Sequence, residues 1–169
     1  MPWGVRWLVA FDEGEKMSWT KKPFGGRADE FETVRIGNQV WMAHNFVSWE
    51  GTAKADPEWD VAKYGTLFAV DDAICSAPKG WHLPTVAEWE LLSANVRRSL
   101  EPKKLLLEDF RLVLKDSHAW FWTATKSSTG AHALIAETSK FNLDEGNYGF
   151  ALVPKSSSLY RCPARYLRD

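Results

Sequence analysis

The sequence predicts one α+β domain preceded by a short extension. A capped helix is expected near the middle of the chain, and runs with strand-like alternation lie on both sides of it. The chain also holds 10 Trp in 169 residues. Because each aromatic side chain can bury roughly 150–250 Å², we expect the interior, or a binding face, to be built from rings.

The first 28 residues are expected to form a strand and a linker, and residues 29–169 the domain. Between residues 3 and 11 every second residue is apolar, which predicts a strand. The residues on that side are Trp3, Val5, Trp7, Val9 and Phe11. Residues 12–26 are polar and interrupted by Gly and Pro, so they predict a loop or linker.

A hairpin is predicted over residues 32–42, with Gly37 and Asn38 at the turn. Residues 45–63 are expected to be irregular, with Trp49 and Trp59 among them, and residues 64–68 to form a short strand. Residues 70–77 predict a short helix, because apolar residues recur there at helical spacing.

The central segment predicts a turn, a helix cap and a helix in succession. Pro84 favours extended backbone at the residue before it. Thr85 and Glu88 have capping-box spacing: the Thr hydroxyl accepts from the Glu88 amide, and the Glu carboxylate from the Thr85 amide. The helix is expected over residues 86–100. We interpret six residues as a structural motif: Trp81, Leu83, Pro84, Thr85, Glu88 and Trp89.

Short strands are expected in the last third of the chain. Residues 104–114 are rich in Leu but do not decide between helix and strand. Strands are predicted over residues 120–125, 131–137, 148–153 and 159–167, and Pro163 suggests an edge or a bulge in the last of them.

Five segments carry recognisable motifs: TVRIGNQVWMAHN at residues 33–45, YGTLF at 64–68, PKGWHLPTVAEW at 78–89, WFWTAT at 120–125 and YRC at 160–162. Together they resemble the Fibrobacter succinogenes major paralogous (FISUMP) domain, a family of bacterial surface and secreted modules. The resemblance runs from about residue 29 to the end. The usual Trp-Ser-Ser-Thr of the family is altered at residues 122–125.

The resemblance implies a C-type lectin-like fold, with two helices packed on twisted antiparallel strands and adjacent chain ends. That fold also includes the formylglycine-generating enzymes and the variable proteins of diversity-generating retroelements. From the residues alone, Cys75 and Cys162 are either a disulfide or two reduced thiols. The resemblance favours the disulfide, although Cys75 stands two positions earlier than is usual in the family.

Several classes of function are disfavoured by composition. The net charge of −1 and the absence of a basic cluster argue against nucleic acid. No apolar run is long enough for a membrane span, and no signal peptide is recognised, so the chain either stays inside the cell or its leader lies outside this sequence. We expect no metal, cofactor or catalytic residue, because calcium-ligand motifs, His spacing typical of metal sites and a C-terminal cysteine pair are all missing.

A non-enzymatic, calcium-independent binding or display module of a bacterial or phage surface protein is therefore expected. Its ligand would be a protein or carbohydrate on a cell surface. Candidate ligand-binding residues are Trp120, Trp122, His132, Asn142, Asn147 and Tyr148. For the two Trp residues, a place in the core is the competing interpretation.

Alternatives remain for function, location and assembly. The chain could be a retroelement variable protein that binds through its C-terminal third, or an enzyme of unrecognised chemistry. An extracellular or cell-surface location is expected, with the cytoplasm or a phage virion as alternatives. Residues 1–28 could also join copies into a homo-oligomer.

Overall fold

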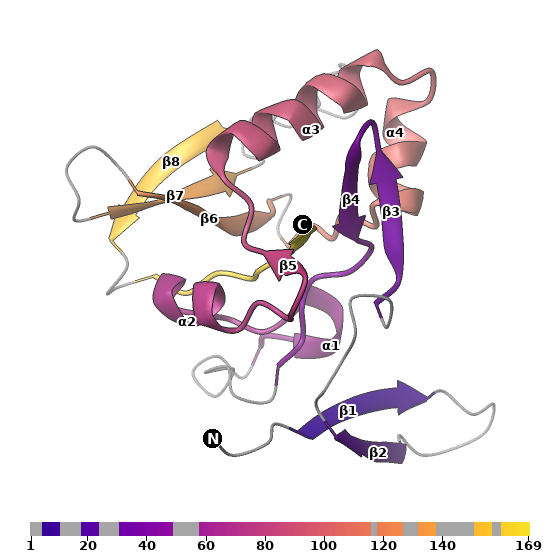
Figure 1. Cartoon of the computed structure of the whole chain (residues 1–169), viewed down its shortest axis with the longest axis vertical. Coiled ribbons are helices and arrows are strands. Elements are labelled where there is room, and N and C mark those ends of the chain that lie inside the picture. The colour runs from indigo at the N-terminus through magenta and orange to yellow at the C-terminus, as the bar shows by residue number, and fades with distance from the viewer. Residues whose placement is uncertain are drawn as a thin grey trace.

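The computed structural model describes residues 5–10, 18–23, 31–48, 58–115, 118–126, 132–137, 151–156 and 160–169, and for 5–10, 18–23, 132–137 and 151–156 it describes the backbone. The protein is mixed α/β, with short helices and antiparallel strand pairing in three sheets (Figure 1). The predicted mixture of helices and antiparallel strands is confirmed at this level.

The N-terminal extension contains two paired strands. β1 (Val5–Ala10) and β2 (Ser18–Pro23) run antiparallel as a two-stranded sheet. The predicted first strand is therefore confirmed, but the prediction of a loop over residues 12–26 was wrong for β2. Trp and Thr at its start favour extended backbone, and the Gly and Pro residues that indicated a linker fall before it (Gly14), at its end (Pro23) and after it (Gly25 and Gly26). Residues 1–4 lie outside the described residues, so the adjacency of the chain ends stays a prediction.

The predicted hairpin is present and belongs to a four-stranded sheet. β3 (Thr33–Ile36) pairs with β4 (Gln39–Met42) through a two-residue turn. Gly37 has φ 61° there, and a Cβ at this position would collide with the side chain of Asn95. Glycine is therefore favoured at position 37 for two reasons: its backbone is left-handed, and it lies close to the helix that carries Asn95.

The same sheet joins the two ends of the region from residue 31 onward. Its order is β3-β4-β9-β5, with β5 at Trp81–His82 and β9 at Leu167–Arg168. β9 pairs with both β4 and β5. The predicted strand over residues 159–167 was too long, because among its described residues, 160–167, only Cys162, in an isolated bridge with Phe68, and Leu167 make strand pairs. Pro163 lacks the amide hydrogen that a continuous ladder requires.

The longest helix is α3 (Val86–Arg98), and it begins as predicted. The Glu88 amide donates to the Thr85 hydroxyl at 3.4 Å, and the Thr85 amide donates to the Glu88 carboxylate at 2.7 Å. α3 contacts β3 of the four-stranded sheet and both β6 and β7 of the three-stranded sheet (Figure 1). Its buried face carries Trp89, Leu92, Ser93 and Val96.

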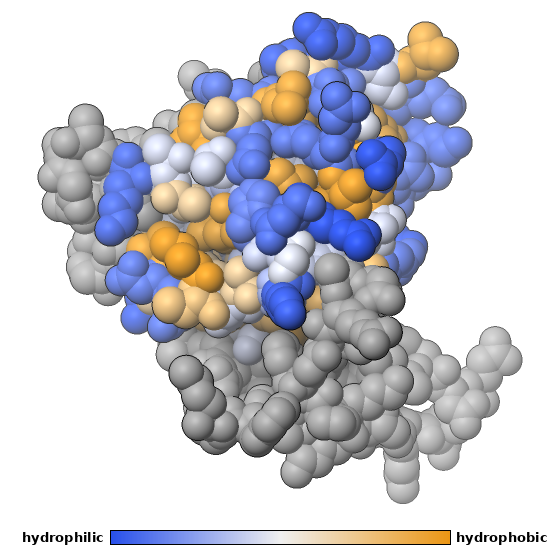
Figure 2. Space-filling model, in the orientation of Figure 1, coloured by the Kyte–Doolittle hydropathy of each residue, from blue (hydrophilic) through white to orange (hydrophobic). Residues whose placement is uncertain are grey.

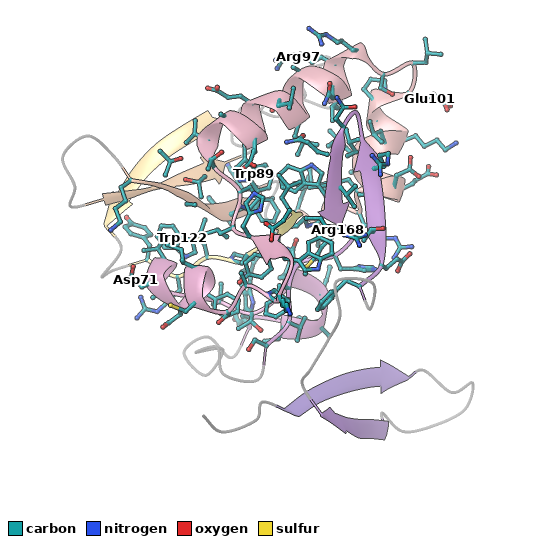
Figure 3. The ribbon with its side chains drawn as sticks, viewed as in Figure 1. Asp71, Trp89, Arg97, Glu101, Trp122 and Arg168 are labelled. Carbon is teal, nitrogen blue, oxygen red and sulfur yellow. The ribbon has the colours of Figure 1, made fainter. Side chains whose placement is uncertain are left out.

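The Leu-rich segment that the sequence left undecided is helical. α4 (Pro102–Lys104) continues into a π-helical turn, η2 (Leu105–Asp109). Leu106 and Phe110 are completely buried against α3 and β4 as part of one of two aromatic-rich core clusters. In Figure 3, Trp89 points from α3 into the interior, whereas Arg97 and Glu101 lie at the periphery.

Two short helices come before the central segment. α1 (Val61–Tyr64) ends at Gly65 and has no buried residue, and α2 (Val70–Cys75) follows the Phe68 bridge and contributes Val70 and Ala73 to the second core cluster. The short strand predicted over residues 64–68 was wrong except at Phe68, because the Asp60 side chain accepts from the Lys63 amide and caps a helical turn instead. The helix predicted over residues 70–77 is confirmed in α2.

The three-stranded sheet is formed by the strands predicted in the last third. β6 (Trp120–Lys126), β7 (His132–Glu137) and β8 (Ala151–Ser156) pair antiparallel in that order. β8 starts three residues later than the predicted strand at residue 148. The register of β6 shifts between Trp122 and Lys126, which is the mark of a bulge or irregularity.

Candidate functional site

A shallow aromatic pocket opens beside the start of β6. It encloses about 220 Å³ of space between side chains, part of it open to solvent. Four rings that are only half-buried form its walls: Trp59, Tyr64, His118 and Trp120. The other lining residues are Asn45, Val113, Lys115, Ala119, Phe121 and Pro163. We call this set the ring pocket.

One wall of the ring pocket is held by α1. The indole N–H of Trp59 donates to the Gly65 carbonyl at 2.8 Å, and the rings of Trp59 and Tyr64 lie 5.0 Å apart. Asp60 caps the helical turn that separates the two rings. Trp59 is thus fixed by a hydrogen bond across six residues, which leaves part of its ring available to a ligand.

The opposite wall depends on a tight pairing between Lys115 and His118. Each residue donates its amide to the carbonyl of the other, at 2.8 and 3.0 Å. Residues that exchange both hydrogen bonds in an antiparallel pair project their side chains from the same face. The His118 ring then stacks on Trp120 with 5.6 Å between centroids and an angle of 9°. The Lys115 ammonium lies 5.9 Å from the centroid of Trp59.

A buried cation lies behind the floor of the pocket. Arg165 is completely buried, and two of its nitrogens donate to the Asn45 side-chain oxygen at 2.9 and 2.6 Å. It also donates to the carbonyls of Phe110 and Arg111, and its guanidinium carbon lies 4.2 Å from the centre of the Phe110 ring. Burial lowers the pKa of Arg165 to about 9, so the group is still protonated at pH 7.

No ion pair between described residues includes Arg165. Amide and carbonyl oxygens satisfy its hydrogen bonds, yet its positive charge is not neutralised by them. A buried charge usually has a partner of opposite sign. The described part of the floor therefore carries an excess of positive charge.

The structure brings one of the six predicted ligand-binding residues to the ring pocket. Trp120 lines it. The prediction was wrong for Trp122, which is completely buried and donates its indole N–H to the Phe68 carbonyl at 2.7 Å. Trp120 and Trp122 lie two positions apart and therefore share one face of β6. Trp122 is enclosed in the core on that face, whereas Trp120, the first residue of the strand, packs against the same cluster and is only half-buried. In Figure 3 Trp122 lies within the molecule.

The remaining predicted residues are not tested. His132 starts β7, where the backbone is described. Asn142, Asn147 and Tyr148 lie outside the described residues. The sequence interpretation missed three ring-bearing positions, Trp59, Tyr64 and His118. Trp59 was noted in an irregular segment, but no sequence pattern places it opposite residues that lie about sixty positions later.

A histidine and two carboxylates, one of them Glu88 of the predicted motif, form a charged cluster at the start of α3. His82 Nδ1 lies 2.7 Å from Asp169 Oδ1, and His82 Nε2 lies 2.9 Å from Glu88 Oε1. The other oxygen of Glu88 accepts from the amide and the hydroxyl of Thr85. We call this set the histidine clamp, and it ties β5 to the start of α3 and to the residue after β9.

Electrostatics favour the charged form of each partner in the clamp. Burial alone lowers the pKa of His82, but the hydrogen bonds to Asp169 and Glu88 outweigh it and raise the pKa above its ordinary value of 6.5. Burial alone raises the pKa of Glu88, but the bonds from Thr85 and His82 hold it below 4.5. Each ring nitrogen of His82 lies against a carboxylate oxygen, so both nitrogens are engaged within the clamp.

The predicted disulfide is not formed in the structure. Cys75 and Cys162 are both thiols, Cys75 exposed at the end of α2 and Cys162 buried in the core. The two residues nevertheless belong to one neighbourhood. Cys162 packs in the same core cluster as Ala73 of α2, and the Tyr166 hydroxyl donates to the Ala73 carbonyl at 2.6 Å. Burial raises the pKa of Tyr166.

Metal sites and membrane spans were sought within the described ranges. These ranges contain no group of three or more His, Cys, Asp or Glu side chains that could hold a metal ion. No helix in them has the length and apolar character needed to cross a bilayer.

On the face in view, Figure 2 shows charged and apolar side chains intermixed over α3 and α4. The exposed large apolar residues among those described come from separate elements: Val47, Ile74, Leu91, Leu100 and Tyr160. Scattered single residues of this kind are normal on a protein surface. They do not define a binding surface.

No known protein-family model matches the chain, and no curated protein or solved structure matches it either. The function is therefore inferred from the geometry of the site.

Proposed function

We propose that the chain is a non-enzymatic, calcium-independent ligand-binding module of a bacterial or phage surface, with a C-type lectin-like fold. The observation that carries the proposal is the ring pocket. Its four rings remain half-buried, whereas four of the six Trp residues with described side chains are enclosed in the core: Trp41, Trp81, Trp89 and Trp122. Rings that stay accessible provide contact area at low entropic cost to a ligand.

The lectin-like fold is supported by the way the ends of the domain meet. β9 lies between β4 and β5, so the last strand pairs with a strand near each of the two recognised motifs. α2 and α3 contact the three-stranded sheet. This arrangement agrees with two helices packed on antiparallel strands, which the resemblance to the FISUMP family implies.

A binding role without catalysis is supported by the chemistry of both sites. The residues found lining the ring pocket include no Ser, Thr, Cys, Asp or Glu, and the one His among them, His118, stacks on Trp120. Calcium requires six to eight oxygen ligands, many of them carboxylates. The histidine clamp has a carboxylate at each nitrogen, which suits a structural role.

An array of glycans and cell-surface proteins tests the proposal. The wild-type chain, Trp120→Ala and Leu91→Ala are compared with and without a calcium chelator. Leu91 is an exposed apolar residue of α3 outside the pocket and serves as the control. We expect a ligand that the wild type and Leu91→Ala bind equally, that Trp120→Ala loses, and that chelator does not release. Equal binding by Trp120→Ala, or release by chelator, would contradict the proposal.

A retroelement-diversified binder is a second candidate. Seven of the ten lining residues lie between Val113 and Pro163, in the part of the chain where that class displays variable contacts. The candidate requires sibling sequences to differ mainly at exposed positions of this region. Sequencing the locus in related genomes would decide, because uniform variation along the chain would exclude it.

A further inference from the structure

We propose that the outer edge of β3 binds an extended peptide that carries acidic and apolar residues at alternate positions. This edge is a different surface from the ring pocket, and its role does not depend on the function proposed there. Three features of β3 point to such a partner: the direction of its backbone groups, the exposure of its edge, and an Arg that has no carboxylate beside it.

The backbone of β3 alternates between groups that bond to β4 and groups that face outward. The Ala43 amide donates to the Glu32 carbonyl at 2.9 Å, in line with the register of the β3–β4 pair. Hydrogen-bonded and non-hydrogen-bonded pairs alternate along an antiparallel ladder, so Val34, two residues further on, also bonds to β4. The amides and carbonyls of Thr33 and Arg35 therefore point to the outer edge.

That edge is open in the part of the chain that the structure describes. β3 ends its sheet, with β4 on its other side (Figure 1). The Met42 amide, opposite Thr33, donates to the Tyr166 carbonyl at 3.1 Å and so turns away from β3. Thr33 and Arg35 are exposed, and within the described residues neither makes a hydrogen bond or an ion pair beyond its pairing with β4. Unpaired N–H and C=O groups of this kind are a template for another strand.

Charge favours an acidic partner at this edge. Arg35 and Arg168 lie on the same face of the sheet, and both are exposed. The described strand residues of that face include no Asp or Glu. Glu32, just before β3, is already bound by Arg111 at 2.8 and 2.6 Å and by His44 at 3.1 Å. An acidic side chain opposite Arg35 on an added strand would share its face and pair with it.

The other face of β3 favours an apolar residue at the next position of the peptide. Val34 is half-buried, and both Val34 and Leu105 of η2 pack against the core cluster that contains Trp41. η2 lies against this face, where the ring of Phe110 is 5.7 Å from that of Trp41, so its carboxylates do not share the face of Arg35. An apolar side chain opposite Val34 would cover part of this cluster.

Two peptides of opposite charge test the proposal: acetyl-TEVEVET-amide and acetyl-TKVKVKT-amide. Backbone NMR signals report binding, and hydrogen exchange reports which amides become bonded. In the free protein the outward amides of Thr33 and Arg35 should exchange faster than that of Val34, which bonds to β4. We expect the glutamate peptide to slow exchange at Thr33 and Arg35, to bind about fivefold more tightly than the lysine peptide, and to weaken with added salt.

Backbone methylation separates strand addition from simple charge attraction. In a strand whose glutamates lie opposite Thr33 and Arg35, the glutamate amides donate to β3 and the valine amides face away. N-methylation of the central glutamate should weaken binding about threefold to tenfold, the effect of losing one hydrogen bond. N-methylation of the valine after it is the matched control and should change the affinity little.

A pair of Arg variants tests the charge. Arg35→Gln should weaken the glutamate peptide about twofold to fivefold, the range of an exposed ion pair. Arg161→Gln removes an exposed Arg outside the four-stranded sheet and should leave the affinity unchanged. Because Arg35 makes no side-chain contact of its own with a described charged group, its replacement should not disturb the fold.

Each contrary outcome overturns a stated part of the proposal. Equal weakening by the two methylated peptides would exclude strand addition, and equal affinity of the glutamate and lysine peptides would exclude an acidic partner. Slow exchange at Thr33 and Arg35 in the free protein, together with a dimeric mass in solution, would mean that a second copy occupies the edge instead. Trp120→Ala should bind the peptide unchanged, so a negative result here leaves the function proposed for the ring pocket in place.

Discussion

The protein uses aromatic rings in two places and in two ways. In the core beneath α3, the rings of Trp41, Trp89, Phe110 and Phe121 are completely buried, and Trp89 lies 4.8 Å from Trp41 and 5.0 Å from Phe121. In the ring pocket, the rings pack in pairs at similar spacing but remain half-buried. Ring–ring geometry is thus the same in both regions, and the difference lies in what covers the remaining faces.

This comparison shows that aromatic content by itself does not reveal a binding site. Three of the four core rings stand within regular elements, Trp41 in β4, Trp89 in α3 and Phe121 in β6. Two of the four pocket rings, Trp59 and His118, stand in connecting segments, where hydrogen bonds hold the indole of Trp59 and the backbone of His118. The other two stand at the ends of elements, since Tyr64 ends α1 and Trp120 begins β6. Binding residues on loops that a rigid scaffold positions are common in proteins.

The largest expected effect on stability is that of Trp89→Ala, which removes a ring from the core. Removing a completely buried Trp should lower the free energy of unfolding by about 3–5 kcal/mol, because the cavity beneath α3 cannot collapse fully. Chemical denaturation followed by circular dichroism would measure the loss. A loss below about 1 kcal/mol would mean that these rings are not a packed core.

The cap of α3 should contribute less. Thr85→Ala removes the hydroxyl that accepts from the Glu88 amide and donates to its carboxylate, and should cost about 1 kcal/mol. Thr85→Ser keeps the hydroxyl and should restore most of it. If Ser and Ala are equally destabilising, the capping box is not what stabilises the helix start.

The histidine clamp should make stability depend on pH. The pKa of His82 is raised in the folded protein, so its contribution is complete below the unfolded value of 6.5 and is lost as the pH rises through the folded value. The pKa of Glu88 is lowered, so its contribution is present above 4.5 and is lost as the pH falls through the folded value. The clamp should therefore stabilise most between these two values.

Because His82 is 36% exposed, solvent screens the clamp, and we expect a contribution of only about 0.5–1 kcal/mol. Denaturation at a series of pH values would measure it, with His82→Gln as the comparison. The variant should lose the decline of stability above pH 6.5. An unchanged pH profile would show that the clamp does not contribute to stability.

The smallest effect on stability is expected at the pocket. His118→Ala removes a ring that is only half-buried, and should change the free energy of unfolding by about 0.5 kcal/mol or less. Binding of the ligand found on the array should nevertheless weaken. A stability loss close to that of Trp89→Ala would assign His118 to the core and remove the distinction between the two regions.

The features that could be predicted from the sequence are local. The capping box, α3 and the turn at Gly37 depend on residues a few positions apart, whose chemistry is decided before the chain folds. The error at Trp122 shows that such local chemistry does not decide how deeply a side chain is buried. The run at residues 120–122 indicates a strand, but both of its faces are buried, Phe121 in one core cluster and Trp122 in the other. The depth at which each ring lies depends on distant elements, β7 and α2.

The ring pocket could not be predicted for the same reason. Its walls come from residues near 45, near 60, near 118 and at 163, which only the finished fold brings together. The prediction of a loop over residues 12–26 was wrong for a different reason. Gly and Pro residues on both sides of β2 and at its end gave the whole segment the composition of a linker.

The support of Arg165 has a consequence for acid conditions. Its hydrogen-bond acceptors are an amide oxygen and two main-chain carbonyls. None of these groups takes up a proton as a solution is acidified from about pH 7 to pH 3. A carboxylate in the same position would be protonated over that interval, and the guanidinium would lose its negatively charged partner. The interior around Arg165 should thus persist in acid after the surface contacts of Glu88 have weakened.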